Sequence, residues 1–155
     1  MVRNQENWKQ EQSRNYIPVH PRDYFLDKDK NIVKEDLFTS CADEIAKSFK
    51  FDKPPMKSSQ VRKFYDEILR RKMIIELETD EKKKKEAFLK QLPYIRMIIS
   101  KAVYANNRKQ PTVNNNFKKF IENNIGNIKE YKEFEVFCDL FEAVVAYSKK
   151  YLGDY

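Results

Sequence analysis

Glycine is almost missing from this chain of 155 residues, which contains only Gly126 and Gly153. Tight hairpin turns and many bends in sheets depend on glycine, so its scarcity argues against a fold rich in β-structure. The two glycines also stand far apart, which excludes the glycine-rich loop that cradles phosphates in nucleotide-binding proteins. The composition therefore favours helices joined by short connections.

Residues suited to catalysis, metal binding and membrane insertion are equally scarce. His20 is the only histidine, so no histidine pair exists for a zinc site or an acid–base relay. Cys41 and Cys138 lie in apolar helical patterns, where reduced, buried thiols are expected rather than a disulfide. No apolar run is long enough to span a membrane, and the first residues lack the apolar stretch of a signal peptide. We expect a cytoplasmic protein with no enzymatic activity, no cofactor and no membrane contact.

Apolar residues recur at helical spacing through most of the chain. The pattern predicts helices over about 34–50, 58–75, 81–106, 112–126 and 129–152. Ser58 or Ser59 is expected to cap the second helix and Thr112 the fourth, and Pro93 must either kink the third helix or begin a new one. Residues 1–30 are polar and lack a sustained period. The sequence thus predicts an all-α protein, with a polar N-terminal arm at 1–30 and one compact bundle of about five helices at 31–155.

The positive charge of the chain is concentrated in its middle third. Residues 58–119 contain 16 basic and 7 acidic side chains, a net charge of +9, whereas 1–57 and 120–155 have net charges of +1 and −3. No carboxylate occurs between Ala87 and Ile121. An ordinary solvated surface mixes charges of both signs, so a long stretch of one sign indicates a polyanionic partner.

The third predicted helix has two distinct faces. At 100° per residue, its apolar side chains gather on one broad face. The opposite face carries cations and tyrosines in alternation, namely Lys90, Tyr94, Lys101, Tyr104 and Arg108 with Met97 among them. Lysine and arginine neutralise phosphates, and tyrosine can hydrogen-bond to a phosphate or stack on a base. The alternative is a set of solvated lysines with tyrosines packed on a neighbouring helix. Because carboxylates are missing, we favour nucleic-acid contact here.

Further cations on other predicted helices are candidates for the same contact. On the second helix, Lys63 and Arg70 point away from the apolar side and Arg62 lies at its flank, but neighbouring acids dilute this face. Lys118 and Lys119 lie at the start of the fourth helix, where a solvated edge is the slightly favoured interpretation. The candidate RNA-binding residues are Arg62, Lys63, Arg70, Lys90, Lys101, Arg108, Lys118 and Lys119.

A carboxylate stripe offers the one catalytic alternative. Glu135, Asp139 and Glu142 share a face of the last predicted helix and could in principle hold a divalent metal for a nuclease. Exposed acidic stripes are commonplace, however, and this one lies in the acidic third of the chain. Pairing with basic neighbours or solvation is the expected role.

Three segments together resemble a known family. They are SSQVRKFYDEILR at 58–70, FLKQLPYIRMIISKAVYANNR at 88–108 and FEVFCDLFEAVVAYSKKYLG at 134–153. In this order and spacing they resemble the small subunit of type III-A CRISPR effector (Csm) complexes. The resemblance implies a small helical bundle without enzymatic activity, copies of which stack along a filament that holds the guide RNA. Its implied partners are guide RNA, target RNA, the other Csm subunits and copies of itself.

The resemblance also implies roles for particular residues. It assigns RNA contact to Arg62, Lys63, Arg70, Lys101 and Arg108, and structural positions to Tyr104 and Tyr147. Lys90 precedes the Leu-Pro pair of its segment and Lys118 lies outside all three segments, so the resemblance assigns neither of them and both rest on helical geometry alone. The alternative from a different functional class is a helical scaffold whose basic face docks an acidic protein.

Overall fold

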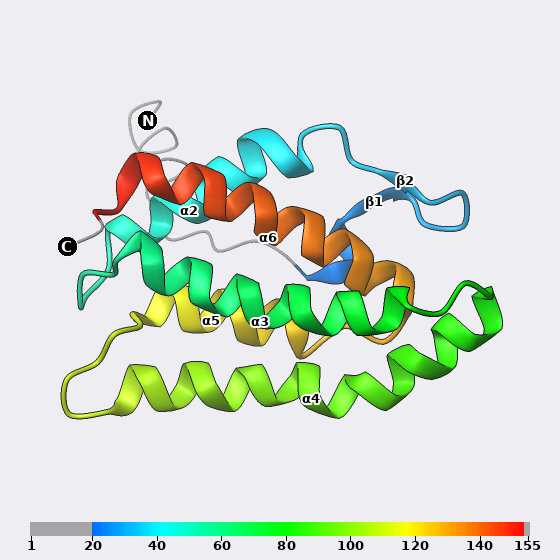
Figure 1. Ribbon diagram of the computed structural model, residues 1–155. Coiled ribbons are helices and arrows are strands. Elements are labelled where there is room, and N and C mark those ends of the chain that lie inside the picture. Colours follow the sequence, from blue (N-terminus) through cyan, green and yellow to red (C-terminus); the bar gives the residue numbers. More distant parts are fainter. Residues whose placement is uncertain (1–19, 154–155) are drawn as a thin grey trace.

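The computed structural model describes residues 20–153 and contains five α-helices, which confirms the all-α prediction. The helices are α2 (Ala42–Lys50), α3 (Ser58–Glu76), α4 (Glu81–Asn107), α5 (Asn115–Ile125) and α6 (Tyr131–Tyr151). Figure 1 shows α3 and α4 running side by side in opposite directions, with α6 along the other side of α3. Within the described residues, no helix combines the length and apolarity that crossing a membrane would require.

The core is built around α6, whose apolar side faces α2 and α3. Phenylalanines from four helices meet there, with neighbouring ring centroids 5.1–6.3 Å apart. This aromatic cluster consists of Phe49, Phe64, Phe117, Phe120, Phe137 and Phe141. Tilted and edge-on rings at this separation attract one another beyond the gain from burial alone. The cluster therefore fixes α2, α3, α5 and α6 relative to one another.

The chain before α2 adds a small element that helical periodicity did not predict. A short 3₁₀ turn (η1, Pro21–Asp23) leads into an antiparallel pair of strands, β1 (Phe25–Asp27) and β2 (Ile32–Val33). The first helix was expected to start near Lys34, which is wrong. Val33 pairs with Phe25, and the Lys34 amide donates to the Tyr24 carbonyl at 2.9 Å. A π-helical turn (η2, Leu37–Cys41) then leads into α2.

Two predicted caps differ in detail from expectation, whereas Pro93 follows one of its two predicted alternatives. Helix α3 begins at Ser58 with Lys57 at the N-cap position. Asn114, not Thr112, caps α5, since its side chain accepts from the Phe117 amide at 3.0 Å while the Thr112 amide bonds to Ala105. Pro93 lies inside a continuous α4. It cannot donate a helical hydrogen bond to the carbonyl of Leu89, and Figure 1 shows α4 changing direction along its course.

Part of the predicted N-terminal arm packs on the bundle. Residues 1–19 lie outside the described residues, so the boundary at residue 30 stays a prediction. Tyr24 is completely buried, and its hydroxyl donates to Asn124 Oδ1 at 2.6 Å. Asn124 in turn donates from Nδ2 to the Phe120 carbonyl at 2.8 Å. A buried polar pair of this kind ties the N-terminal segment to α5.

We expect Tyr24→Phe to destabilise the fold, because it leaves the buried Asn124 oxygen without a donor. The cost is about 1–3 kcal/mol, the usual penalty for an unsatisfied buried polar group. Urea unfolding followed by circular dichroism measures it. Tyr147→Phe is the matched control, because the half-buried Tyr147 hydroxyl has no hydrogen-bond partner among residues 20–153. Equal midpoints for the two variants would contradict the role assigned to the Tyr24 hydroxyl.

Candidate nucleic-acid interface

The two faces predicted for α4 are confirmed. Its inner face buries Phe88, Ile95, Ile98 and Ala102, while Lys90, Tyr94, Met97, Lys101, Tyr104 and Arg108 are exposed. On the antiparallel neighbour α3, Val61, Phe64 and Ile68 are buried and Arg62, Lys63 and Arg70 are exposed. Both helices thus turn their polar sides outward along the same flank of the molecule.

A groove of about 520 Å³, here called the α3–α4 groove, lies between these two helices. Its lining residues are Gln60, Lys63, Phe64, Glu67, Ser100, Lys101, Tyr104, Ala105, Arg108 and Thr112. Three of them are cations that the sequence had nominated. The groove is a concave, positively charged surface with aromatic side chains in its wall, which is the arrangement that single nucleic-acid strands use.

The other five nominated cations do not line this groove. Arg70 is exposed on α3, with its Nη1 3.9 Å from Glu67, and Arg62 is exposed on the same helix. Lys90 lines a separate hollow at the α3–α4 turn, together with Glu78 and Glu86. The remaining two are on α5, where Lys118 is half-buried and Lys119 is exposed. The structure therefore brings together Lys63, Lys101 and Arg108.

Sequence reasoning counted Glu67 only among the acids that dilute the outer face of α3, and it missed the pairing of this residue in the groove. Among the described residues that line the groove it is the only carboxylate. Its Oε1 accepts from Lys101 Nζ at 2.8 Å, and this hydrogen bond is the main cause that lowers the pKa of Glu67 below its ordinary value. The other oxygen, Oε2, is buried with no hydrogen-bond partner among residues 20–153. Residues 67 and 101 lie on different helices, so no local pattern could have revealed the pair.

Arg96 lies within the carboxylate-free stretch but has a structural partner. Its Nη1 donates to the carbonyl of Ile125 at 2.8 Å and its Nη2 to that of Ile128 at 2.7 Å. These carbonyls lie at and just beyond the C-terminal end of α5, where a cation also complements the helix dipole. Part of the positive charge of α4 therefore serves to hold α5.

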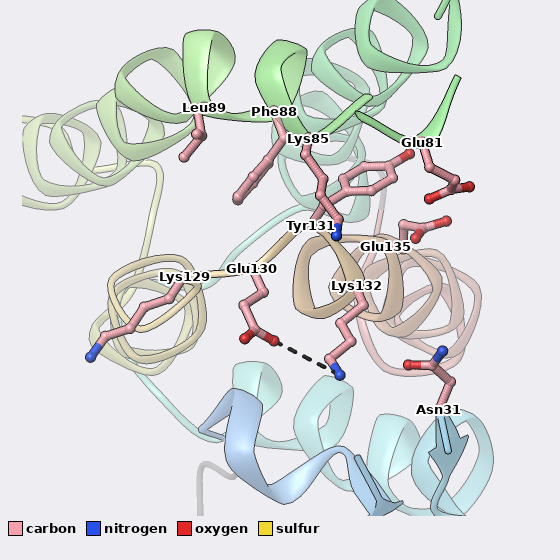
Figure 2. A pocket seen from close by; sticks show the side chains of 10 residues that line it. All are labelled: Asn31, Glu81, Lys85, Phe88, Leu89, Lys129, Glu130, Tyr131, Lys132 and Glu135. Carbon is pink, nitrogen blue, oxygen red and sulfur yellow. Dashed lines mark ion pairs between the residues drawn. The ribbon is translucent and has the colours of Figure 1, made fainter. Parts of the chain in front are cut away.

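The acidic stripe on α6 does not form a metal centre. Within residues 20–153 no group of three or more histidine, cysteine, aspartate or glutamate side chains could hold a metal ion. Asp139 lies 4.0 Å from Lys72 Nζ. Glu135 lines the pocket drawn in Figure 2, between α4, the connection from α5 to α6, and the first turns of α6. The expected pairing with basic neighbours holds for Asp139.

The pocket of Figure 2 differs from the α3–α4 groove in its charge. Three lysines and three glutamates line it, and Lys132 Nζ lies 4.0 Å from Glu130 Oε2. Phe88 and Tyr131 form the floor, with their ring centroids 5.9 Å apart. A pocket lined by positive and negative side chains attracts a polyanion less than a groove lined mainly by positive ones. The candidate interface is therefore the α3–α4 groove.

Comparison with known proteins identifies a family. The family model described as Csm2 Type III-A matches residues 33–154, which include all five helices. No curated protein and no solved structure matches the chain. The matched range contains every residue of the groove and all eight nominated cations.

We expect Arg96→Met to lower the free energy of unfolding by about 2 kcal/mol, because two hydrogen bonds from a charged donor are lost. Arg62→Met, which removes an exposed arginine from α3, should leave stability nearly unchanged. Differential scanning calorimetry of the two variants separates the structural cation from the solvated one. Unchanged stability of Arg96→Met would show that the helix end does not need this cation.

Proposed function

The chain belongs to the Csm2 Type III-A family, the small subunit of the type III-A CRISPR effector complex, and from this premise we propose that its α3–α4 groove contacts the RNA backbone. In this proposal the subunit works in the cytoplasm without catalysing a reaction and stacks with copies of itself along the effector filament. Guide RNA and target RNA are its ligands, and the other Csm subunits are its further partners.

The observation that carries the proposal is the convergence of Lys63, Lys101 and Arg108 on one groove with a single carboxylate. Cations at such a surface neutralise phosphates and release the counterions that surround them. This contribution does not depend on base sequence, which suits a subunit of a complex whose specificity comes from pairing with the guide. Arg62, Arg70, Lys90, Lys118 and Lys119 would extend the contact beyond the groove.

One observation favours a second candidate. Lys101 already binds a carboxylate in this structure, at 2.8 Å from Glu67 Oε1. The same groove could therefore receive an acidic side chain from a protein partner, as a helical scaffold would require. The variants below distinguish an RNA ligand from an acidic protein.

Replacing Lys63 and Arg108 together by glutamine should weaken RNA binding for every sequence by a similar factor. Each lost phosphate contact should also reduce the slope of log binding constant against log salt concentration, by about 0.7 for a single strand. Fluorescence anisotropy with labelled RNAs of unrelated sequence, over a range of salt concentrations, measures both effects. The matched control replaces Lys47 on α2 and Lys149 on α6 by glutamine. Both lysines are exposed, so the control removes the same amount of charge away from the groove.

Two outcomes would count against this function. A loss confined to some RNA sequences would indicate base readout instead of backbone contact. Co-expression with the other Csm subunits and a guide array provides the second test. If the Lys63/Arg108 variant lost a protein subunit while keeping its RNA, the groove would be a protein-docking surface.

Glu67→Gln should raise RNA affinity by roughly two- to five-fold at low salt, because one unit charge near a surface cation is worth about 1 kcal/mol or less. Removing the carboxylate frees Lys101 and Arg70 for phosphate. Anisotropy measures the change, with Glu142→Gln on α6 as the control of equal charge. A fall in affinity would mean that Glu67 orients Lys101 for the ligand.

A further inference from the structure

Tyr104 is an aromatic ring left open at the α3–α4 groove. Its side chain is 70% exposed and has no ring contact or hydrogen bond among residues 20–153. Tyr94, ten residues earlier on α4, is different because the Arg71 guanidinium lies 5.1 Å from its ring centroid. One tyrosine of this helix is thus engaged within the protein, whereas the other presents its ring to the groove.

The position of Tyr104 relative to the cations is set by the helix. Lys101 precedes it by three residues on α4, and Arg108, the C-cap residue just after α4, follows it by four, so the three lie along one side of the helix and its end. Each cation lies about one helical turn, or roughly 5 Å, from the tyrosine along the axis. All three also line the groove, with Lys63 contributed by α3. A strand whose phosphates contact these cations would bring its bases beside the ring.

We propose that Tyr104 stacks on an unpaired base, so that the α3–α4 groove takes single-stranded RNA in preference to a duplex. This inference rests on the proposed contact with the RNA backbone and adds a contact between Tyr104 and a base. Stacking on an aromatic side chain tolerates any base, because every base has a flat π-face. In a duplex both faces of each base are covered by neighbouring pairs, so the tyrosine could reach only the backbone.

The test compares three probes of equal length on the full chain: single-stranded RNA, the same strand with its bases removed, and an RNA duplex. Wild type should bind the single strand at least about five-fold more tightly than the abasic strand, the lower limit for one stacked base. Tyr104→Leu should abolish this difference and leave binding of the abasic strand and the duplex unchanged. Tyr104→Phe keeps the ring and should bind like wild type.

Phe51→Leu serves as the control, since Phe51 is 64% exposed just after α2 and does not line the groove. Ultraviolet cross-linking to the single strand gives a second readout. The cross-link should fall on the tryptic peptide of residues 102–108, whose only aromatic residue is Tyr104. Tyr104→Leu should eliminate this cross-link without affecting the fold.

The outcomes separate this inference from the function on which it rests. Equal affinity for the intact and abasic strands, unchanged by Tyr104→Leu, would overturn stacking and leave the backbone contact standing. Loss of affinity in Tyr104→Phe would also overturn it, since the hydroxyl and not the ring would then make the contact. If none of the probes bound, the proposed function and the stacking would both fail.

Discussion

Phe64 connects the core of this protein to its candidate binding surface. Its ring centroid lies 5.1 Å from that of Phe117 on α5, and Phe117 in turn meets Phe141 on α6. The same side chain also lines the α3–α4 groove. Burial of this ring determines which side of α3 faces inward, and so it determines that Lys63 faces out. Hydrophobic packing therefore sets which side of α3 carries the charged surface.

Helical periodicity predicted the fold well where the helices are long and amphipathic. The inner and outer faces of α4 followed directly from the spacing of Ile95, Ile98 and Ala102. The start of the first helix could not be predicted in this way. It depends on the pairing of Phe25 with Val33, and such pairing between separate segments leaves no local period in the sequence.

The sequence predicted which cations of the candidate site are exposed, but it did not predict which residues they contact. The nominated cations are exposed except for the half-buried Lys118, because a helical wheel gives the side of a helix that each residue occupies. A helical wheel does not show which residue of another helix a side chain contacts. The Glu67–Lys101 pair and the carbonyl partners of Arg96 were therefore not predicted. The resemblance implied structural positions for Tyr104 and Tyr147. Tyr147 is half-buried against the core, whereas Tyr104 is largely exposed.

The contact between Tyr24 and Asn124 has a consequence for where this domain can be cut. The family model matches the chain from residue 33, yet the hydroxyl that donates to the buried side chain of Asn124 comes from nine residues earlier. A fragment trimmed to the shared region would open a hole beside α5 and leave an amide oxygen facing it. The segment that the family model matches is thus shorter than the segment that packs together in the fold, and the longer one is the unit to express.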